Sequence, residues 1–242
     1  MLGAVIGAGA AALAGTAAYQ SMAPTGQWCG RTFVRGKPGS KQIALTYDDG
    51  PNDPHTLRLL EVLAKHGARA TFFLIGRFVE QRPDIVREIV KAGHVVGNHT
   101  FTHPRLIFTS AVQTRIELQR CQQAIAAAVG QDVNLFRPPF GGRRPETLRI
   151  VRTMGLTPVM WSITGFDWTA PPAERIVRRV SRYIRGGDVV LLHDGSHLGI
   201  GADRAQTVIA TGRILEHWSS QGYKFVAVPE MLEAHKAAQV GA

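Results

Sequence analysis

Seven times along this chain of 242 residues, a short apolar run is followed by a longer amphipathic segment. The apolar runs, which predict strands, occupy residues 41–46, 70–75, 94–97, 133–137, 157–162, 188–192 and 223–227. The segments with an apolar period near that of a helix occupy residues 55–66, 83–92, 109–129, 144–154, 172–185, 204–221 and 229–238. This alternation predicts an α/β fold with parallel strands, and it fits both a closed barrel and an open sheet.

Length and composition predict one domain. Apolar residues make up 45% of the chain, which is enough to bury one sizeable core, and barrels of this length are often single units. We expect the domain to span residues 41–238. Residues 19–40, which carry several prolines and glycines, are expected to form a linker or a surface lead-in.

Residues 1–18 are uncharged and rich in alanine and glycine. The segment resembles the apolar part of a signal peptide or a short membrane anchor, although no basic residue comes before Arg31. Residues 2–18 fall slightly short of the ~20 apolar residues of a spanning helix. We expect an extracytoplasmic protein of the cell envelope, secreted or attached through residues 2–18. The basic residues that follow this segment would instead favour a cytoplasmic location for the chain on its C-terminal side.

The chain is strongly basic, with a formal net charge of +10. This suggests an anionic partner, or equally a solvated basic surface. The basic residues are scattered, and aromatic residues do not alternate with them as a stacking platform for nucleic acid requires. We expect a monomer without a nucleic-acid partner. Cys29 and Cys121 could pair in an oxidising compartment, but a buried free thiol is the favoured role for Cys121.

Polar side chains follow the ends of five predicted strands. They are Asp48 and Asp49 after the first, His99 and His103 after the third, Arg137 at the end of the fourth, Asp167 after the fifth and His193 after the sixth. Active sites in parallel α/β folds gather at the carboxyl ends of the strands. We therefore expect these side chains to converge on a single site.

Asp48 and Asp49 stand on a Gly-Pro turn after the apolar run 43–45. Two carboxylates there are costly unless a metal or a proton transfer needs them, although such residues also form ordinary turns. His99 and His103 are four residues apart, so on one helical turn their rings can share a metal. With Asp49 they would leave coordination positions open for water and substrate.

The run Arg137-Pro138-Pro139-Phe140-Gly141 is rigid and poor in backbone donors. Because proline has no N–H, Phe140 offers the first free amide, which suits an oxyanion. Arg137 can hold a carboxylate ionised, or can be a solvated residue at a strand exit.

His193 can act as an acid near neutrality, and a neighbouring aspartate would orient it and raise its pKa. Single histidines are more often structural, which is the role expected of His55, His66, His94, His217 and His235. His197 stays open, because it lies in the loop 194–201 on the expected active face.

Several motifs occur in order along the chain: TYDDGP (46–51), ATFFLIG (70–76), GHVVGNHTFTHP (93–104), RPPFG (137–141), FDW (166–168) and VVLLHD (189–194). Together with DRAQTV (203–208) and QGYKFVAVPEML (221–232), they resemble the polysaccharide deacetylases of carbohydrate esterase family 4, the NodB homology domain. The resemblance covers about residues 41–235. It implies a distorted (β/α)7 barrel in a single domain and hydrolytic removal of acetyl groups from N-acetylated sugars.

The resemblance also implies roles for individual residues. One divalent metal, most commonly Zn²⁺ with Co²⁺, Ni²⁺ or Mn²⁺ as alternatives, would bind to Asp49, His99 and His103. Asp48 resembles the catalytic base held by Arg137. His193 resembles the catalytic acid, and Asp167 resembles the residue that adjusts its pKa. Arg69 is expected to hold Asp167 in turn. The supporting and substrate-binding positions are Thr100, which braces its loop, the Phe140 amide, Trp168 and Leu191.

Two positions depart from the family pattern. Thr164 stands where the fourth motif usually begins with an aspartate, and Tyr47 replaces the commoner phenylalanine. Every position with a direct chemical role is filled. The sequence therefore predicts a metal-dependent N-deacetylase acting on N-acetylglucosamine units of peptidoglycan or a chitin-type glycan. The alternatives are an acetyl-xylan esterase, a hydrolase of small cyclic amides and a non-catalytic glycan-binding homologue.

Overall fold

The computed structural model describes residues 15–240, so most of the predicted apolar segment 1–18 lies outside the described residues. The strands are β1 (Gln42–Gly50), β2 (Ala70–Leu74), β3 (Val95–Asn98), β4 (Leu135–Phe136), β5 (Thr157–Pro158), β6 (Ile163–Thr164), β7 (Asp188–His193) and β8 (Lys224–Phe225). Residues 15–22 are helical, and the α-helices after them are α2 (His55–Lys65), α3 (Gly76–Gln81), α4 (Pro83–Lys91), α5 (Ala111–Val129), α6 (Pro145–Thr153), α7 (Ala173–Tyr183), α8 (Ala205–Ser220) and α9 (Val228–Val240). Short 3₁₀ turns lie at Leu106–Phe108, Pro139–Gly141 and Asp167–Thr169.

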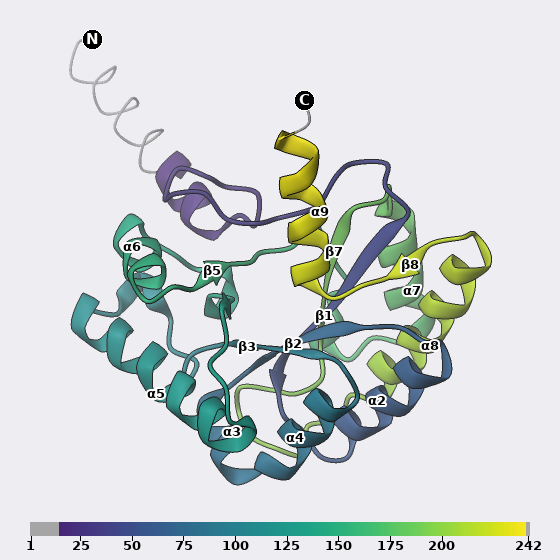
Figure 1. The fold of residues 1–242 in the computed structure, drawn as a ribbon, viewed down its shortest axis with the longest axis horizontal. Coiled ribbons are helices and arrows are strands. Elements are labelled where there is room, and N and C mark those ends of the chain that lie inside the picture. The colour runs from purple at the N-terminus through teal and green to yellow at the C-terminus, as the bar shows by residue number, and fades with distance from the viewer. Residues whose placement is uncertain (1–14, 241–242) are drawn as a thin grey trace.

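All strands pair in parallel, in the order β5-β4-β3-β2-β1-β7-β6, with β8 beside β1 as well. The end strands β5 and β6 do not pair with each other, so the curled sheet forms a partial barrel with helices around it (Figure 1). This agrees with the predicted α/β class and with a distorted (β/α)7 barrel in one domain. The longest strand, β1, lies between β2 and β7.

Two element predictions differ from the structure. The run 157–162 was expected as one strand, but β5 and β6 flank a segment that crosses the open side of the sheet. The short helix α3 was not predicted, because six residues are too few to show a helical period.

Part of the segment 19–40 lies against the sheet. Phe33 forms a parallel bridge to Val159, and Arg35 forms an antiparallel bridge to Asp188. Arg143 is fully buried and donates to the carbonyl oxygens of Ala23 and Gly141, at 2.8 and 2.9 Å. These contacts connect the lead-in to the loop after β4.

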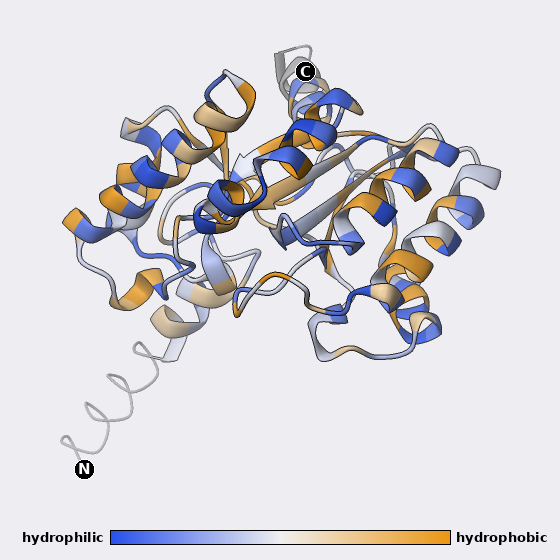
Figure 2. Cartoon of the chain, turned by 90° about the horizontal axis from the view of Figure 1, so that it is seen from below, coloured by the Kyte–Doolittle hydropathy of each residue, from blue (hydrophilic) through white to orange (hydrophobic). Residues whose placement is uncertain are grey.

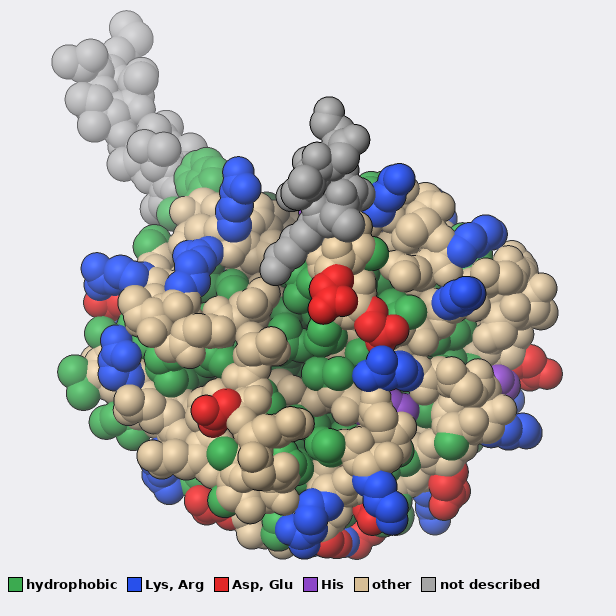
Figure 3. Space-filling view, in the orientation of Figure 1, with side chains coloured by type: hydrophobic (Ala, Val, Ile, Leu, Met, Phe, Trp, Pro, Cys, Tyr) green, Lys and Arg blue, Asp and Glu red, His purple; other side chains and the backbone are tan. Residues whose placement is uncertain are grey.

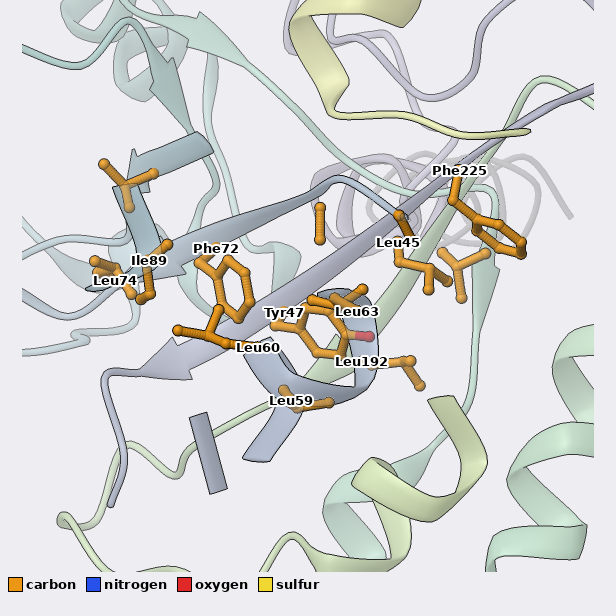
Figure 4. Close-up of a cluster of buried hydrophobic side chains, with 14 of the residues drawn as sticks. Leu45, Tyr47, Leu59, Leu60, Leu63, Phe72, Leu74, Ile89, Leu192 and Phe225 are labelled. Carbon is orange, nitrogen blue, oxygen red and sulfur yellow. The ribbon is translucent and has the colours of Figure 1, made fainter. Parts of the chain in front are cut away.

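The two faces of β1 divide the core, because successive side chains of a strand point to opposite sides. Ile43, Leu45 and Tyr47 face the surrounding helices, and Figure 4 shows Leu45 and Tyr47 among leucines of α2. Ala44 instead belongs to a second cluster inside the curl, to which α9 contributes Met231. The helices carry both hydrophilic and hydrophobic residues, as expected of amphipathic helices on a sheet (Figure 2).

Within the described residues, no helix is both long and apolar enough to span a bilayer. Lys and Arg side chains are spread over the face shown in Figure 3 rather than gathered in one patch. Cys29 and Cys121 are both free thiols, and Cys121 is buried as predicted.

Candidate functional site

Asp48 and Asp49 reach the same site because β1 ends in an irregular turn. Asp48 is paired with Phe73 and Gly50 with Leu74, so Asp49 is an extra residue in the ladder between β1 and β2. Asp49 has φ of 73°, in the left-handed region that few non-glycine residues adopt. A bulge of this kind re-aims a side chain. Without it, Asp49 would point to the helices, on the face opposite to Asp48.

Asp49, His99 and His103 converge as predicted. Their ligand atoms all lie within 4.8 Å of one another, and all three residues are buried. Asp49 Oδ1 is 3.5 Å from His99 Nε2 and 3.2 Å from His103 Nε2. The buried Oδ1 nonetheless has no hydrogen-bond partner among the described residues. These three atoms lie close together without hydrogen bonds between them, which is the arrangement expected of ligands around a divalent cation.

The charge states of these residues favour a cation. Burial lowers the pKa of His103 to about 3, with the neighbouring His99 adding to the effect, so its ring is neutral at physiological pH. Burial alone would raise the pKa of Asp49, but its interactions with His99 and the other histidine rings hold that pKa below its usual value. A neutral imidazole at His103 and an ionised carboxylate at Asp49 are the forms of these two side chains that bind a metal.

The loop 99–103 that carries both histidines has a strained backbone. Thr100 and His103 have φ of 68° and 64°. Thr100 Oγ1 accepts the His103 amide at 3.1 Å, which is the bracing contact expected of this threonine. From α5, the buried Glu117 accepts the amides of Phe101 and Thr102 at 3.0 and 2.8 Å. Sequence reasoning missed Glu117, because its role depends on a helix that begins beyond the loop.

Asp48 is held apart from this set by Arg137. Arg137 Nη1 donates to Asp48 Oδ1 at 2.8 Å and to Thr46 Oγ1 at 2.7 Å, and its side chain is fully buried. Two backbone carbonyls, of Val159 and Met160, accept hydrogen bonds from its Nε and Nη2 at 3.3 and 3.0 Å. The guanidinium therefore engages one oxygen of the Asp48 carboxyl group. The other oxygen, Oδ2, lies 3.7 Å from His99 Nε2, beside the predicted metal position.

The loop after β4 presents Phe140 as its sequence suggested. Phe140 has φ of 56°, and its amide donates no hydrogen bond to another described residue. Its ring packs against His103 at 4.6 Å between centroids. The amide is thus a free donor at the edge of the site.

His193, the last residue of β7, pairs with Asp167, which lies in the 3₁₀ turn after β6. Asp167 Oδ1 is 2.9 Å from His193 Nδ1, and its Oδ2 accepts the His193 amide at 2.7 Å and the Thr207 hydroxyl at 2.9 Å. Burial alone would lower the pKa of His193. The charge and hydrogen bond of Asp167, with the carboxylates of Asp48 and Asp49, raise it instead to about 9. His193 is therefore protonated at neutral pH and can act as an acid.

The prediction that Arg69 holds Asp167 is wrong. Arg69 donates from Nε to the Gly93 carbonyl oxygen at 2.9 Å and pairs with Glu230 at 3.0 Å. It directly precedes β2, so it lies at the amino edge of the parallel sheet, whereas Asp167 belongs to the carboxyl edge. Thr207 is the side chain that holds the second oxygen of Asp167. Thr164 Oγ1 accepts the Phe166 amide at 3.3 Å, so it supports the turn before Asp167.

A cavity of about 380 Å³ joins these groups. Trp168 and Leu191 line it as predicted, and so does Phe140. Its lining also includes residues that were not predicted: Gly141, Trp161, Ser196, Leu198 and Arg204. His197, which the sequence left open, lines it too, with its ring 4.7 Å from that of His103. Its loop was expected on the active face, but no motif indicated the contact with His103.

A partial parallel barrel in which Asp49, His99 and His103, a second carboxyl group held by an arginine and a protonated histidine surround one cavity is the arrangement of a metal-dependent hydrolase. Residues 35–159 match the family model described as polysaccharide deacetylase. A peptidoglycan-N-acetylglucosamine deacetylase of Bacillus cereus is 38% identical over 194 residues, covering 79% of this chain and 88% of that protein. This chain belongs to the polysaccharide deacetylase family, carbohydrate esterase family 4.

Two further similarities agree. A chitooligosaccharide deacetylase of Azorhizobium caulinodans is 34% identical over 194 residues, covering 77% of this chain and 92% of that protein. The solved structure of a peptidoglycan N-acetylglucosamine deacetylase with a bound benzamide superposes with a TM-score of 0.79. It is 30% identical, and the match covers 83% of this chain and 92% of that one.

Proposed function

We propose that this protein removes acetyl groups from N-acetylglucosamine units of a polysaccharide, with peptidoglycan as the first candidate and chitin-type glycans as the second. The observation that carries the proposal is the single cavity that joins the Asp49, His99 and His103 set to Asp48 and His193. The relatives named as peptidoglycan-N-acetylglucosamine and chitooligosaccharide deacetylases support these two substrate classes.

One divalent metal, most commonly zinc in sites of two histidines and one carboxylate, would be held by Asp49, His99 and His103. Co²⁺, Ni²⁺ and Mn²⁺ suit the same donors. When bound, the cation would polarise the amide carbonyl and lower the pKa of water at the site.

Asp48 would act as the general base. Its Oδ1 is engaged by Arg137, so Oδ2 is the oxygen available to accept a proton from the attacking water. The water oxygen forms the new bond to the acetyl carbon. The Phe140 amide would donate a hydrogen bond to the developing oxyanion, an interaction for which loss of one donor typically costs on the order of 10²–10³ in rate.

His193 would act as the general acid. Its Nδ1 is taken by Asp167, which leaves Nε2 to donate a proton to the sugar nitrogen as the C–N bond breaks. The products are acetate and a free amine on the sugar. Trp168 and Leu191 would contact the acetyl methyl group in the cavity.

We further propose a monomer in the cell envelope, attached to the membrane or exported through residues 2–18. The net charge of +10 suits an acidic polymer surface, and the basic residues are too dispersed for a nucleic-acid platform.

A substrate panel tests the proposal. Acetate release is measured from peptidoglycan, chitin oligomers and acetylated xylan, before chelation, after chelation and with each metal restored. We expect release from the first two, lost with chelator and regained with Zn²⁺. Release from xylan alone would indicate an esterase. Glycan binding without any release in the presence of metal would indicate a non-catalytic homologue.

A further inference from the structure

We propose that His197 is a positioning residue for the metal centre, which acts by stacking on the ring of His103. This inference rests on the proposed metal-dependent function and deepens it. His197 comes from the loop after β7 and belongs to none of the motifs found in the sequence. Its contribution is to fix the plane of the His103 ring, and so the direction of His103 Nε2.

The two histidines of the metal set are held differently. His99 Nδ1 lies 2.8 Å from the carbonyl oxygen of Arg137, so a hydrogen bond fixes its ring. His103 Nδ1 is buried and has no hydrogen-bond partner among the described residues. Metal-binding histidines almost always donate their second ring nitrogen to a fixed acceptor. His103 lacks that restraint, so something else must set its orientation.

Aromatic packing supplies the missing restraint. The His197 ring lies nearly parallel to that of His103, with centroids 4.7 Å apart and an interplanar angle of 19°. Phe140 meets the same ring edge-on, at 4.6 Å and 70°. His197 and Phe140 are also in contact with each other, at 5.3 Å. Turning the His103 ring would break both contacts.

The loop that carries His197 is itself anchored. Arg77 of α3 donates to the His197 carbonyl oxygen. A side chain at Gly195 would come within 2.2 Å of the Asp49 carbonyl oxygen, so the loop runs directly against the end of β1. Asn52 accepts the Gly201 amide at 2.6 Å. His197 is therefore held on the same framework that positions Asp49.

Ligation and hydrogen bonding fit His197 less well than stacking does. Its Nδ1 is 4.0 Å from Asp49 Oδ2, which is too long for a hydrogen bond. Within the described residues, the group close enough to share a metal is Asp49, His99 and His103, without His197. The ring is also half-exposed, so an aromatic replacement can occupy its place.

Three variants of the full chain test the inference: His197→Ala, His197→Phe and the control His217→Ala on the exposed face of α8. The dissociation constant for Zn²⁺ is measured by competition with a chromophoric chelator, and the visible spectrum is recorded with Co²⁺. Thermal unfolding of the metal-free proteins checks that each variant folds. Because outer partners of metal-binding histidines typically contribute 10–100-fold in affinity, we expect His197→Ala to weaken Zn²⁺ binding about tenfold.

His197→Phe should restore the affinity to about that of the unmodified chain, because it keeps the ring and loses the nitrogens. His217→Ala should leave the affinity unchanged. If His197→Phe bound Zn²⁺ as weakly as His197→Ala, the stacking role would be wrong, and an imidazole nitrogen of His197 would be the group that matters. An unchanged affinity in His197→Ala would overturn the inference altogether. If the unmodified chain bound no divalent metal, the proposed function would fail together with the inference, an outcome distinct from the other two.

Discussion

At the scale of single residues, the site depends on one buried charge network. Arg137 is fully buried, donates to Asp48 and Thr46, and lies over the Phe73 ring at 4.2 Å. Breaking a buried ion pair leaves an unpaired charge, which typically costs about 3–5 kcal/mol of folding free energy. Removing Arg137 from the contact that holds the proposed base should therefore destabilise the fold.

We expect Arg137→Met to lower the free energy of unfolding by about 3–5 kcal/mol at pH 7, measured by chemical denaturation. Adding Asp48→Asn should recover part of this loss, because the buried carboxylate no longer lacks a partner. Losses that simply add in the double variant would contradict a direct coupling between the two residues.

The pair of His193 and Asp167 predicts a shift in the pH dependence of activity. The pKa of His193 is raised to about 9, so the proton needed by the leaving nitrogen is present at neutral pH and is lost as pH rises through about 9. Asp167→Asn removes the charge that opposes burial, so the His193 pKa should fall. The alkaline limb of kcat/KM against pH should then move to lower pH, and an unmoved limb would argue against His193 as the acid.

At the scale of elements, α5 holds the loop that carries both histidines of the proposed metal site. Glu117 accepts two backbone amides and the Thr102 hydroxyl from that loop. We expect Glu117→Ala to lower the free energy of unfolding by about 2–3 kcal/mol and to weaken Zn²⁺ binding, because hydrogen bonds to a charged group are lost. Glu117→Gln should lose less, since one acceptor remains.

The matched control is Gln119→Ala on the exposed face of the same helix. Denaturation and chelator competition are measured on all three proteins. A Glu117→Ala protein with reduced stability but unchanged Zn²⁺ affinity would show that the loop keeps its geometry without α5.

The helices and strands were largely predictable because the apolar residues of each follow the period of its own secondary structure. The long helices α5 and α8 and the buried strands β1 and β7 match their predicted ranges within a few residues. The prediction of one strand over the run 157–162 was wrong, because an apolar run has the same sequence pattern whether it pairs as one strand or crosses the open side of the sheet. The sheet pairing that ends β5 at Pro158 and begins β6 only at Ile163 is non-local.

The site was predictable as a set of residues at strand ends, but not in its fine geometry. The bulge that turns Asp49 toward Asp48 depends on the pairing of β1 with β2. The predicted contact between Arg69 and Asp167 was wrong because Arg69 precedes β2. It therefore lies at the amino edge of the sheet, whereas the site lies at the carboxyl edge. Glu117 gave no signal, and the sequence did not predict the contacts that Thr207 and His197 make, since each of the three acts on a residue far away in the chain.

At the scale of the whole molecule, metal binding should stabilise the fold. The proposed ligands come from β1 and the loop after β3, so the metal joins parts that separate on unfolding. At a free Zn²⁺ concentration 100 times the dissociation constant, the stabilisation is about 2.7 kcal/mol. We expect the thermal midpoint to rise with Zn²⁺ and fall with chelator, and the shift to vanish in His103→Ala. A shift that persists in that variant would place the metal elsewhere.

The central claim is that the adjacent carboxylates of Asp48 and Asp49 have separate roles, one as base and the other as ligand. It is tested most directly by measuring bound metal and acetate release on the same preparations of Asp48→Asn and Asp49→Ala. We expect Asp49→Ala to lose metal and activity together, and Asp48→Asn to keep its metal while losing acetate release. Equal loss of metal in both variants, or acetate release at the unmodified rate by Asp48→Asn, would contradict this division.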